Sequence, residues 1–421
     1  MLLRLCVCGV FAFVTIFFLE ETFVRAQATT DFASWKDVQN AEAVPNWAGQ
    51  MLRRFRDVTG TAREELLTKT FAALKEIASD DHVVPSTRYN AILAAGQLVS
   101  REPSPGNLPV AYSAALPYLI EVYQKPDTPH YLKYGALLGI VRHTISGIDA
   151  AQQDHVIDLL LETVTTEFKA DEVALNVAPF EPAAWDWFRQ TALDGLAALK
   201  TAGTDNKVIT ELLAVIHYKS QELENFCLHQ GAFTRREREQ SRRAIELASK
   251  AAKTLGDLDY TLVSNIDATA MTDAFIRLTR AVCLIESKAA SDFIEQEKTP
   301  LDPARLLERI IVNVKMCTQS VVWGIRSGFL PVSPAVKPGE NSFYASLKEG
   351  DPAIGKLDVL LTEIIELAVF LDEGDKANRS VTIPNAPKEL KFGLPELRDV
   401  LAKTSEVLAK IQHNNSDAPT P

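Results

Sequence analysis

Cysteine is scarce in this chain, with five in 421 residues. Cys6 and Cys8 lie in an apolar run at the N-terminus, which leaves Cys227, Cys283 and Cys317 for the rest of the chain. Three cysteines allow one disulfide at most, so a disulfide-stapled framework is excluded. Cys283 and Cys317 lie in apolar helical patterns, which favours buried thiols that act as small hydrophobes. A Cys283–Cys317 disulfide between neighbouring helices is the alternative.

The sequence also lacks the motifs that mark common catalytic centres. It contains no H-E-x-x-H, no G-x-S-x-G, no phosphate-binding glycine loop and no paired C-x-x-C. The seven histidines are scattered, and Asp80-Asp81-His82 is typical of a solvated turn between helices, with a metal site as the alternative. We therefore assign no catalytic residue, no metal ligand and no cofactor.

Positive charge is in deficit, because the formal net charge is −11. An acidic surface repels phosphate backbones and anionic lipid head groups, so we expect no nucleic-acid partner. The 47% apolar and 24% charged fractions are typical of a folded chain.

The N-terminus has the order of a secretory signal peptide. Arg4 precedes an apolar run from Leu5 to Leu19, and Ala26-Gln27-Ala28 supplies the small residues of a cleavage site. An uncleaved anchor is the alternative, but a helix over that run spans about 22 Å, less than the hydrocarbon core of a bilayer. We expect cleavage after Ala28, export to the periplasm or the extracellular space, and no stable membrane insertion afterwards.

Amphipathic helices follow in pairs from residue 61, and their second members share a pattern. A basic residue stands three positions before an alanine in each of three helices, and small residues follow: Arg88 and Ala91, Lys133 and Ala136, Arg189 and Ala192. The alanines are 45 and 56 residues apart, and the longer interval indicates an insertion near residues 169–186. A fourth unit near Ala244 has Ser241 in place of the basic residue.

In this pattern the chain resembles the HEAT-repeat family of armadillo-like helical solenoids over residues 61–200. The resemblance implies an α-α superhelix that presents an extended binding surface. We predict an all-α fold, with a signal peptide at 1–28, a lead-in segment at 29–60 containing Trp35 and Trp47, HEAT-like repeats at 61–255, a helical bundle at 256–412 and a disordered tail at 413–421.

Capping residues predict the helices of the second half. Asp302-Pro303 and Asp351-Pro352 are typical of helix starts, while Gly328 and Gly374 are expected after the ends of the same helices. Loops are predicted at 329–350 and 373–393.

Two segments are candidates for a partner surface. The first is an aromatic cluster at the end of the insertion, formed by Phe180, Trp185, Trp187 and Phe188, for which core filling is the alternative. The second is a basic run that starts after the capping-box residues Thr234 and Glu237 and includes Arg235, Arg238 and Arg242. A solvated helix face, with Glu237 and Glu239 paired to the arginines, is the simpler interpretation of the run.

Two functions remain open at this stage. The first is an exported, non-enzymatic scaffold or protein-binding module of the cell envelope, consistent with a solenoid that lacks catalytic motifs. The second is a helical envelope enzyme that acts on a glycan through dispersed acidic and histidine residues.

Overall fold

The structure is a computed structural model that describes residues 49, 52–53, 55, 58–167, 182–229, 231–295, 302–328, 338–379 and 393–413. These residues belong to one compact unit that begins at Ala48. The predicted signal peptide, Trp35, Trp47, Phe180 and the predicted tail from 414 lie outside the described residues.

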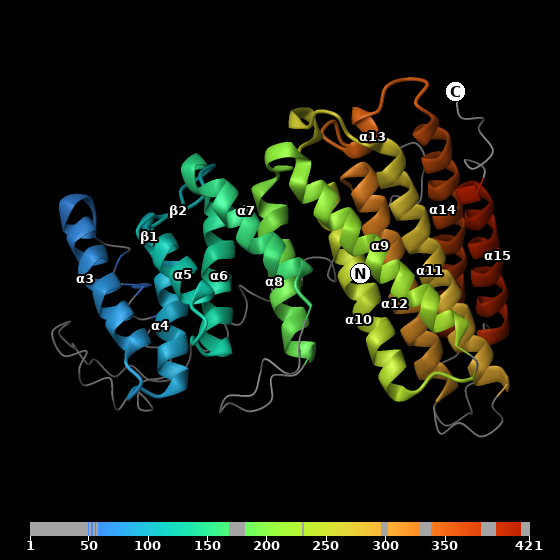
Figure 1. Ribbon diagram of the computed structural model, residues 1–421, viewed down its shortest axis with the longest axis horizontal. Helices are drawn as coiled ribbons and strands as arrows, with labels where there is room; N and C mark the ends of the chain where they lie inside the picture. Colours follow the sequence, from blue (N-terminus) through green and yellow to red (C-terminus); the bar gives the residue numbers. More distant parts are fainter. Residues whose placement is uncertain are drawn as a thin grey trace. The chain divides into compact units, whose positions relative to one another are not determined.

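The all-α prediction is confirmed, because helices make up most of the described chain (Figure 1). A two-stranded antiparallel hairpin, which the sequence did not predict, pairs Val99 with Ala111 and Arg101 with Val110. In chain order the elements are α3 (Gly60–Ser79), α4 (Pro85–Gln97), β1 (Val99–Arg101), β2 (Val110–Ala111), α5 (Ala115–Gln124), α6 (His130–Ser146), α7 (Ala150–Thr165), α8 (Pro182–Leu199), η4 (Thr204–Asn206), α9 (Lys207–Leu228), α10 (Arg235–Gly256), η5 (Tyr260–Leu262), α11 (Ala268–Glu295), α12 (Pro303–Arg326), α13 (Phe343–Ser346), α14 (Pro352–Arg379) and α15 (Leu394–His413).

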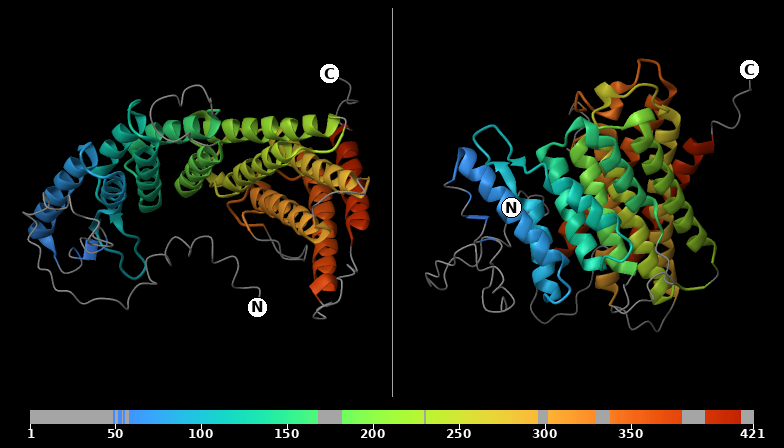
Figure 2. Two further views of the ribbon diagram at one scale, coloured as in Figure 1. Left: turned by 90° about the horizontal axis from the view of Figure 1, so that it is seen from below. Right: turned by 60° about the vertical axis from the view of Figure 1, so that its left-hand side comes forward.

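Consecutive helices pack as antiparallel pairs, and the second helices of neighbouring pairs pack on one another. Thus α3 contacts α4, α5 contacts α6, and α7 contacts α8, while α4, α6, α8, α10 and α12 form a continuous series of contacts (Figure 1). The series continues from α10 into α12, past residue 255, where the sequence predicted the repeats to end. α15 packs along α11, and α14 contacts both α11 and α12 (Figure 2).

Small residues set the spacing of the second helices. A Cβ atom on Gly96 of α4 would lie 2.5 Å from the Cα of Gly139 in α6, and one on Gly195 of α8 would lie 3.0 Å from Cγ2 of Val141 in α6. In both interfaces, the residue five positions after the pattern alanine of one helix contacts the residue three positions after the pattern alanine of the next helix. The pairs are Gly96 with Gly139 and Val141 with Gly195. The α4–α6 and α6–α8 interfaces therefore use one register.

The basic residue of the shared pattern caps the preceding helix. Nε of Arg88 donates to the carbonyl of Ala78 at 3.0 Å, and Nε of Arg189 donates to the carbonyl of Val164 at 2.7 Å. Both carbonyls belong to the second-to-last residue of their helix, where no intrahelical donor remains. Among the described residues Lys133 makes no equivalent bond.

The predicted helix starts in the second half are correct, and Gly328 follows the end of α12 as expected, whereas the end predicted before Gly374 is wrong. Oδ1 of Asp302 accepts from the amide of Ala304 at 3.0 Å, and Asp351 does the same for Ala353 at 2.9 Å. The residue with a left-handed backbone conformation after α12 is Ser327 (φ 51°), not Gly328. Gly374 is buried inside α14, which continues to Arg379.

The predicted loop at 329–350 contains a short helix, α13. Oγ of Ser342 caps it by accepting from the amide of Ala345 at 3.2 Å. Phe343 is fully buried and packs on the rings of Tyr260 and Phe275, with centroid distances of 5.8 and 6.4 Å. Phe343 anchors this segment together with backbone hydrogen bonds from the amide of Gly339 to the carbonyl of Arg326 and from the amide of Tyr260 to the carbonyl of Asn341.

Cys283 and Cys317 are buried, as expected for thiols in apolar helix faces, and both are free thiols. Burial raises the pKa of the Cys317 thiol to about 12 and also raises the pKa of Cys283. Cys227 is partly exposed and is likewise a free thiol.

Candidate binding site between three helices

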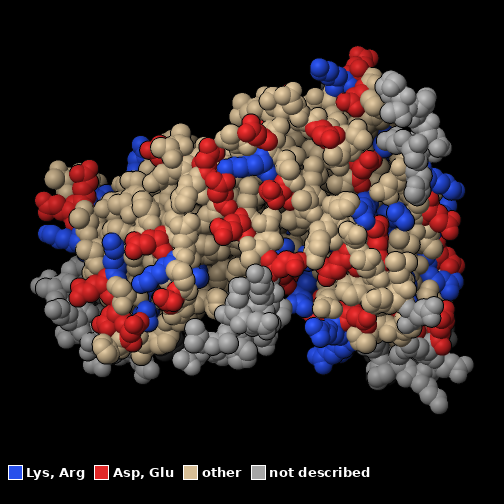
Figure 3. Space-filling model, viewed as in Figure 1, with Lys and Arg blue, Asp and Glu red and all other residues tan. Residues whose placement is uncertain are grey.

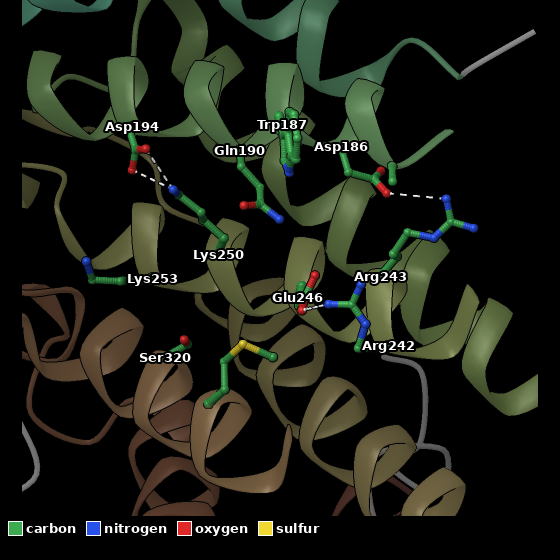
Figure 4. Close-up of a pocket in the computed structure, with 12 residues that line it drawn as sticks. Asp186, Trp187, Gln190, Asp194, Arg242, Arg243, Glu246, Lys250, Lys253 and Ser320 are labelled. Carbon is green, nitrogen blue, oxygen red and sulfur yellow. Dashed lines mark hydrogen bonds and ion pairs between the residues drawn. The ribbon is translucent and has the colours of Figure 1, made fainter. Parts of the chain in front are cut away.

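A cavity of about 560 Å³ lies between α8, α10 and α12 (Figure 4). Its volume is typical of small-ligand and side-chain binding sites. α8 contributes Ala183, Asp186, Trp187, Gln190 and Asp194; α10 contributes Arg242, Arg243, Glu246, Lys250 and Lys253; α12 contributes Met316 and Ser320.

Helical spacing brings these side chains together. On α10 the cavity residues follow one another at intervals of three or four from Arg242 or Arg243 to Lys253, so they share one face of the helix. The same intervals connect Asp186, Gln190 and Asp194 on α8. Because α10 contacts both α8 and α12, its polar face lies between the two flanking helices.

The repeat register places a smaller side chain beside the cavity than at the corresponding positions of α4 and α6. Two positions before the shared alanine stand Tyr89 in α4, Tyr134 in α6 and Gln190 in α8. Tyr89 packs against Gly135 of the next second helix, where a Cβ would lie 3.1 Å from its ring, and the Tyr134 hydroxyl lies 3.4 Å from Oγ1 of Thr191. Gln190 is smaller than a tyrosine, and the cavity lies beside it where this aromatic series ends.

Most charged side chains that line the cavity form ion pairs. Lys250 pairs with Asp194 at 2.7 Å, and Arg242 pairs with Glu246 (Figure 4). Arg242 also pairs with Glu239, at 2.6 Å. Arg243 makes a longer contact of 3.7 Å with Asp186. Each carboxylate that lines the cavity thus has a cationic partner.

Burial changes the acidity of two of these carboxyl groups. Desolvation raises the pKa of Asp186, although Arg243 and other nearby cations oppose the shift. Desolvation likewise raises the pKa of Glu246 against the opposing effect of Arg242. Both groups are therefore easier to protonate than exposed carboxylates.

The predicted aromatic cluster does not form one surface. Phe188 was expected at the partner surface, but it is 3% exposed and packs on the rings of Tyr134 and Trp185. Trp185 stacks on Phe188 at 5.3 Å, and its Nε1 donates to the carbonyl of Thr166 at 3.0 Å. Trp187 is 61% exposed and lines the cavity. Residues 185 and 188 share one helix face and residue 187 lies on another, which explains the division.

The basic run divides in the same way. Arg235 is exposed, Arg238 donates to the carbonyl of Phe233 at 2.6 Å, and Arg242 lines the cavity. Lys and Arg side chains gather over the start of α10 in Figure 3. The capping box is confirmed, since Thr234 and Glu237 exchange hydrogen bonds at 3.2 and 2.7 Å. Glu239 pairs with Arg242 as expected, whereas Glu237 caps the helix instead of pairing with an arginine.

Of the candidate partner residues, the structure therefore brings Trp187 and Arg242 to one cavity. Sequence reasoning did not find Gln190, Lys250 or Lys253, which also line it. The only signal for Gln190 was its position in the repeat register, where two tyrosines precede it.

Asp80-Asp81-His82 lies in the turn between α3 and α4. Asp80 accepts from the amide of His82 at 2.9 Å, and Asp81 pairs with Arg88 at 2.7 Å, which is the predicted turn. Within the described ranges no group of three or more His, Cys, Asp or Glu side chains is placed to hold a metal ion. None of the described helices combines the length and the apolar character that crossing a bilayer requires.

Comparison of the chain with known protein families, with curated proteins and with solved structures gave no significant match.

Proposed function

We propose that this protein is an exported, non-enzymatic helical scaffold that binds a protein partner at the α8–α10–α12 cavity. The observation that carries the proposal is Trp187, a large apolar side chain that is 61% exposed beside a cavity of about 560 Å³. Tryptophan and arginine are the residue types most enriched among the energetic centres of protein interfaces, and this cavity contains both.

The repeat register supports the solenoid part of the proposal. Two successive interfaces place corresponding residues together, and two of the three basic residues cap equivalent carbonyls. We propose that α3 to α10 form a HEAT-like array and that α12 continues its inner series. Arrays of this kind bind partners along the surface formed by one series of helices.

Ion pairing in the cavity favours binding over catalysis. Asp186, Asp194 and Glu246 each lie against a cation, and none of the twelve residues that line the cavity is a histidine. Although desolvation raises the pKa of Asp186 and of Glu246, each of these carboxylates lies against a cation, whereas a general base must be within reach of a substrate proton.

Affinity capture from the envelope fraction tests the proposal. The full mature chain is compared with Trp187→Ser and with Leu108→Ser, a matched control because Leu108 is 65% exposed in the loop between β1 and β2. We expect a partner that wild type and Leu108→Ser retain at equal yield and that Trp187→Ser loses. Equal recovery with all three proteins would show that the cavity is not the binding site.

A second candidate function is cleavage of a glycan. It is supported by Asp186 and Glu246, two carboxyl groups of raised pKa that line one cavity together with an exposed tryptophan. Glycoside hydrolysis uses such a pair, one group as acid and the other as base or nucleophile. Release of reducing ends from envelope glycans by wild type, abolished in both Asp186→Asn and Glu246→Gln, would establish it; unchanged release in either variant would exclude it.

Export is tested separately. The proposal expects the mature chain to begin at Thr29, which N-terminal sequencing of protein from the host envelope or medium determines directly. A chain that begins at Met1 in the cytoplasmic fraction would contradict it.

A further inference from the structure

The cation Arg243 has hydrogen-bonding capacity that the protein does not use. Its Nε is buried and has no hydrogen-bond partner, and within the described residues its guanidinium makes a single ion pair, at 3.7 Å to Asp186. A guanidinium carries five N–H donors in a planar fork that fits a carboxylate. Nη1 lies 3.7 Å from Asp186, beyond hydrogen-bond distance, so a carboxylate placed closer to the terminal nitrogens would add a charge-assisted hydrogen bond.

Lys250 and Arg242 are better satisfied than Arg243, whereas Lys253 lies 5.5 Å from the ring centroid of Trp323 and makes no ion pair within the described residues. Lys250 lies 2.7 Å from Asp194, and Arg242 contacts two carboxylates. Four cations and three carboxylates line the cavity, and a fourth carboxylate, that of Glu239, pairs with Arg242 from outside the lining.

We propose that the cavity takes a carboxylate side chain of an acidic peptide segment, seated on Arg243, with a neighbouring aromatic or aliphatic residue of that segment against Trp187. The inference rests on the proposed function and adds the chemical class of the partner. Trp187 supplies apolar contact area at the same cavity, and Gln190 adds an amide that can donate to or accept from a peptide backbone.

An acidic peptide fits this cavity better than an anionic glycan. Asp186, Asp194 and Glu246 alternate with the cations along the cavity walls. A polymer that carries a negative charge on every second sugar would place charges next to these carboxylates and be repelled. A peptide can present one carboxylate at Arg243 and leave uncharged residues beside the acidic wall.

The test uses fluorescence anisotropy with the mature full-length chain and three fluorescein-labelled nonapeptides. Each peptide has one central tryptophan, flanked by glutamates in the first, glutamines in the second and lysines in the third. We expect the glutamate peptide to bind roughly tenfold or more tightly than the glutamine peptide, the ratio given by one charge-assisted hydrogen bond. An uronic-acid oligosaccharide is added as a competitor.

Three variants test whether the preference for glutamate depends on Arg243. Arg243→Gln should abolish the preference for glutamate, whereas Arg236→Gln, which removes the same charge from an exposed position of α10 outside the cavity, should retain it. Asp186→Asn should tighten binding of the glutamate peptide, because it frees Arg243 from its ion pair with Asp186. A gain in affinity cannot result from misfolding, so this variant keeps the test decisive if Arg243→Gln is unstable.

Several outcomes would overturn the inference: equal binding of the three peptides, tighter binding of the lysine peptide, weaker glutamate binding by Asp186→Asn, or displacement of the bound glutamate peptide by an equal concentration of the oligosaccharide. If Trp187-dependent capture of a partner succeeds while the glutamate preference is absent, the proposed function stands and the inference fails. If capture is independent of Trp187, the proposed function fails whatever the peptides show.

Discussion

Replacement of Gly96 by alanine tests the closest helix contact in the array. A Cβ at this position would lie 2.5 Å from the Cα of Gly139 and 3.5 Å from its nitrogen. Carbon atoms pack at about 3.5–4.0 Å, so α4 and α6 would have to separate by roughly 1 Å. The obstacle is backbone, which cannot rotate away as a side chain could.

Two opposing effects set the magnitude. Overpacking a tight interface costs typically 1–3 kcal/mol, and a backbone obstacle places Gly96→Ala near the upper end. Alanine also gains about 1 kcal/mol over glycine in a helix interior. The net expectation is a loss of about 2 kcal/mol in the free energy of unfolding.

Gly355→Ala is the matched control. Gly355 is exposed in the first turn of α14, and no atom lies within 4 Å of a Cβ built there. Here only the helix preference acts, so we expect a gain of roughly 0.5–1 kcal/mol. Urea unfolding followed by circular dichroism at 222 nm measures both variants. If Gly96→Ala were as stabilising as Gly355→Ala, the close approach of α4 and α6 would be refuted.

Two further predictions concern buried charged groups. Arg189→Gln leaves the carbonyl of Val164 without its 2.7 Å donor and should lower the free energy of unfolding by about 1–3 kcal/mol in the same urea assay. The exposed control Arg236→Gln should change it by less than about 0.5 kcal/mol. An equally small change in Arg189→Gln would contradict the capping role. Burial raises the pKa of Glu286 to about 7 from 4.5, so the native state binds a proton that the unfolded chain has released between these pH values. Its contribution to stability is therefore present below pH 4.5 and lost as the pH rises to about 7, by up to roughly 3 kcal/mol. Glu286→Gln should remove this part of the pH dependence while keeping a partner for the Asn313 amide, which donates to Oε1 of Glu286 at 2.6 Å; an unchanged pH profile of urea unfolding would show that Glu286 does not titrate in this range.

Local sequence signals predicted the helices well. The capping box at Thr234 and the N-caps Asp302 and Asp351 act through neighbours within three residues, so the sequence contains all that determines them. The basic residues Arg88 and Arg189 were found as a repeating pattern, although their role as caps of the preceding helix required the pairing of helices.

Features that depend on distant segments were missed. The end of α14 was placed at Gly374 because glycine commonly ends helices, yet this glycine is buried within α14. Phe188 was assigned to a surface because aromatic density does not distinguish the two faces of a helix. The cavity joins α8 to residues up to Ser320, and no local pattern connects segments so far apart in the chain.

Site-specific photo-crosslinking in the native envelope tests the central claim, that a protein partner contacts the cavity at Trp187. A photoreactive phenylalanine analogue is placed at position 187 and, as a control, at position 108, whose side chain is exposed to a similar degree. We predict a discrete protein adduct from position 187 that is absent at position 108 and is lost when Arg243→Gln is combined with it. No protein adduct at position 187, or the same adducts from both positions, would contradict the account.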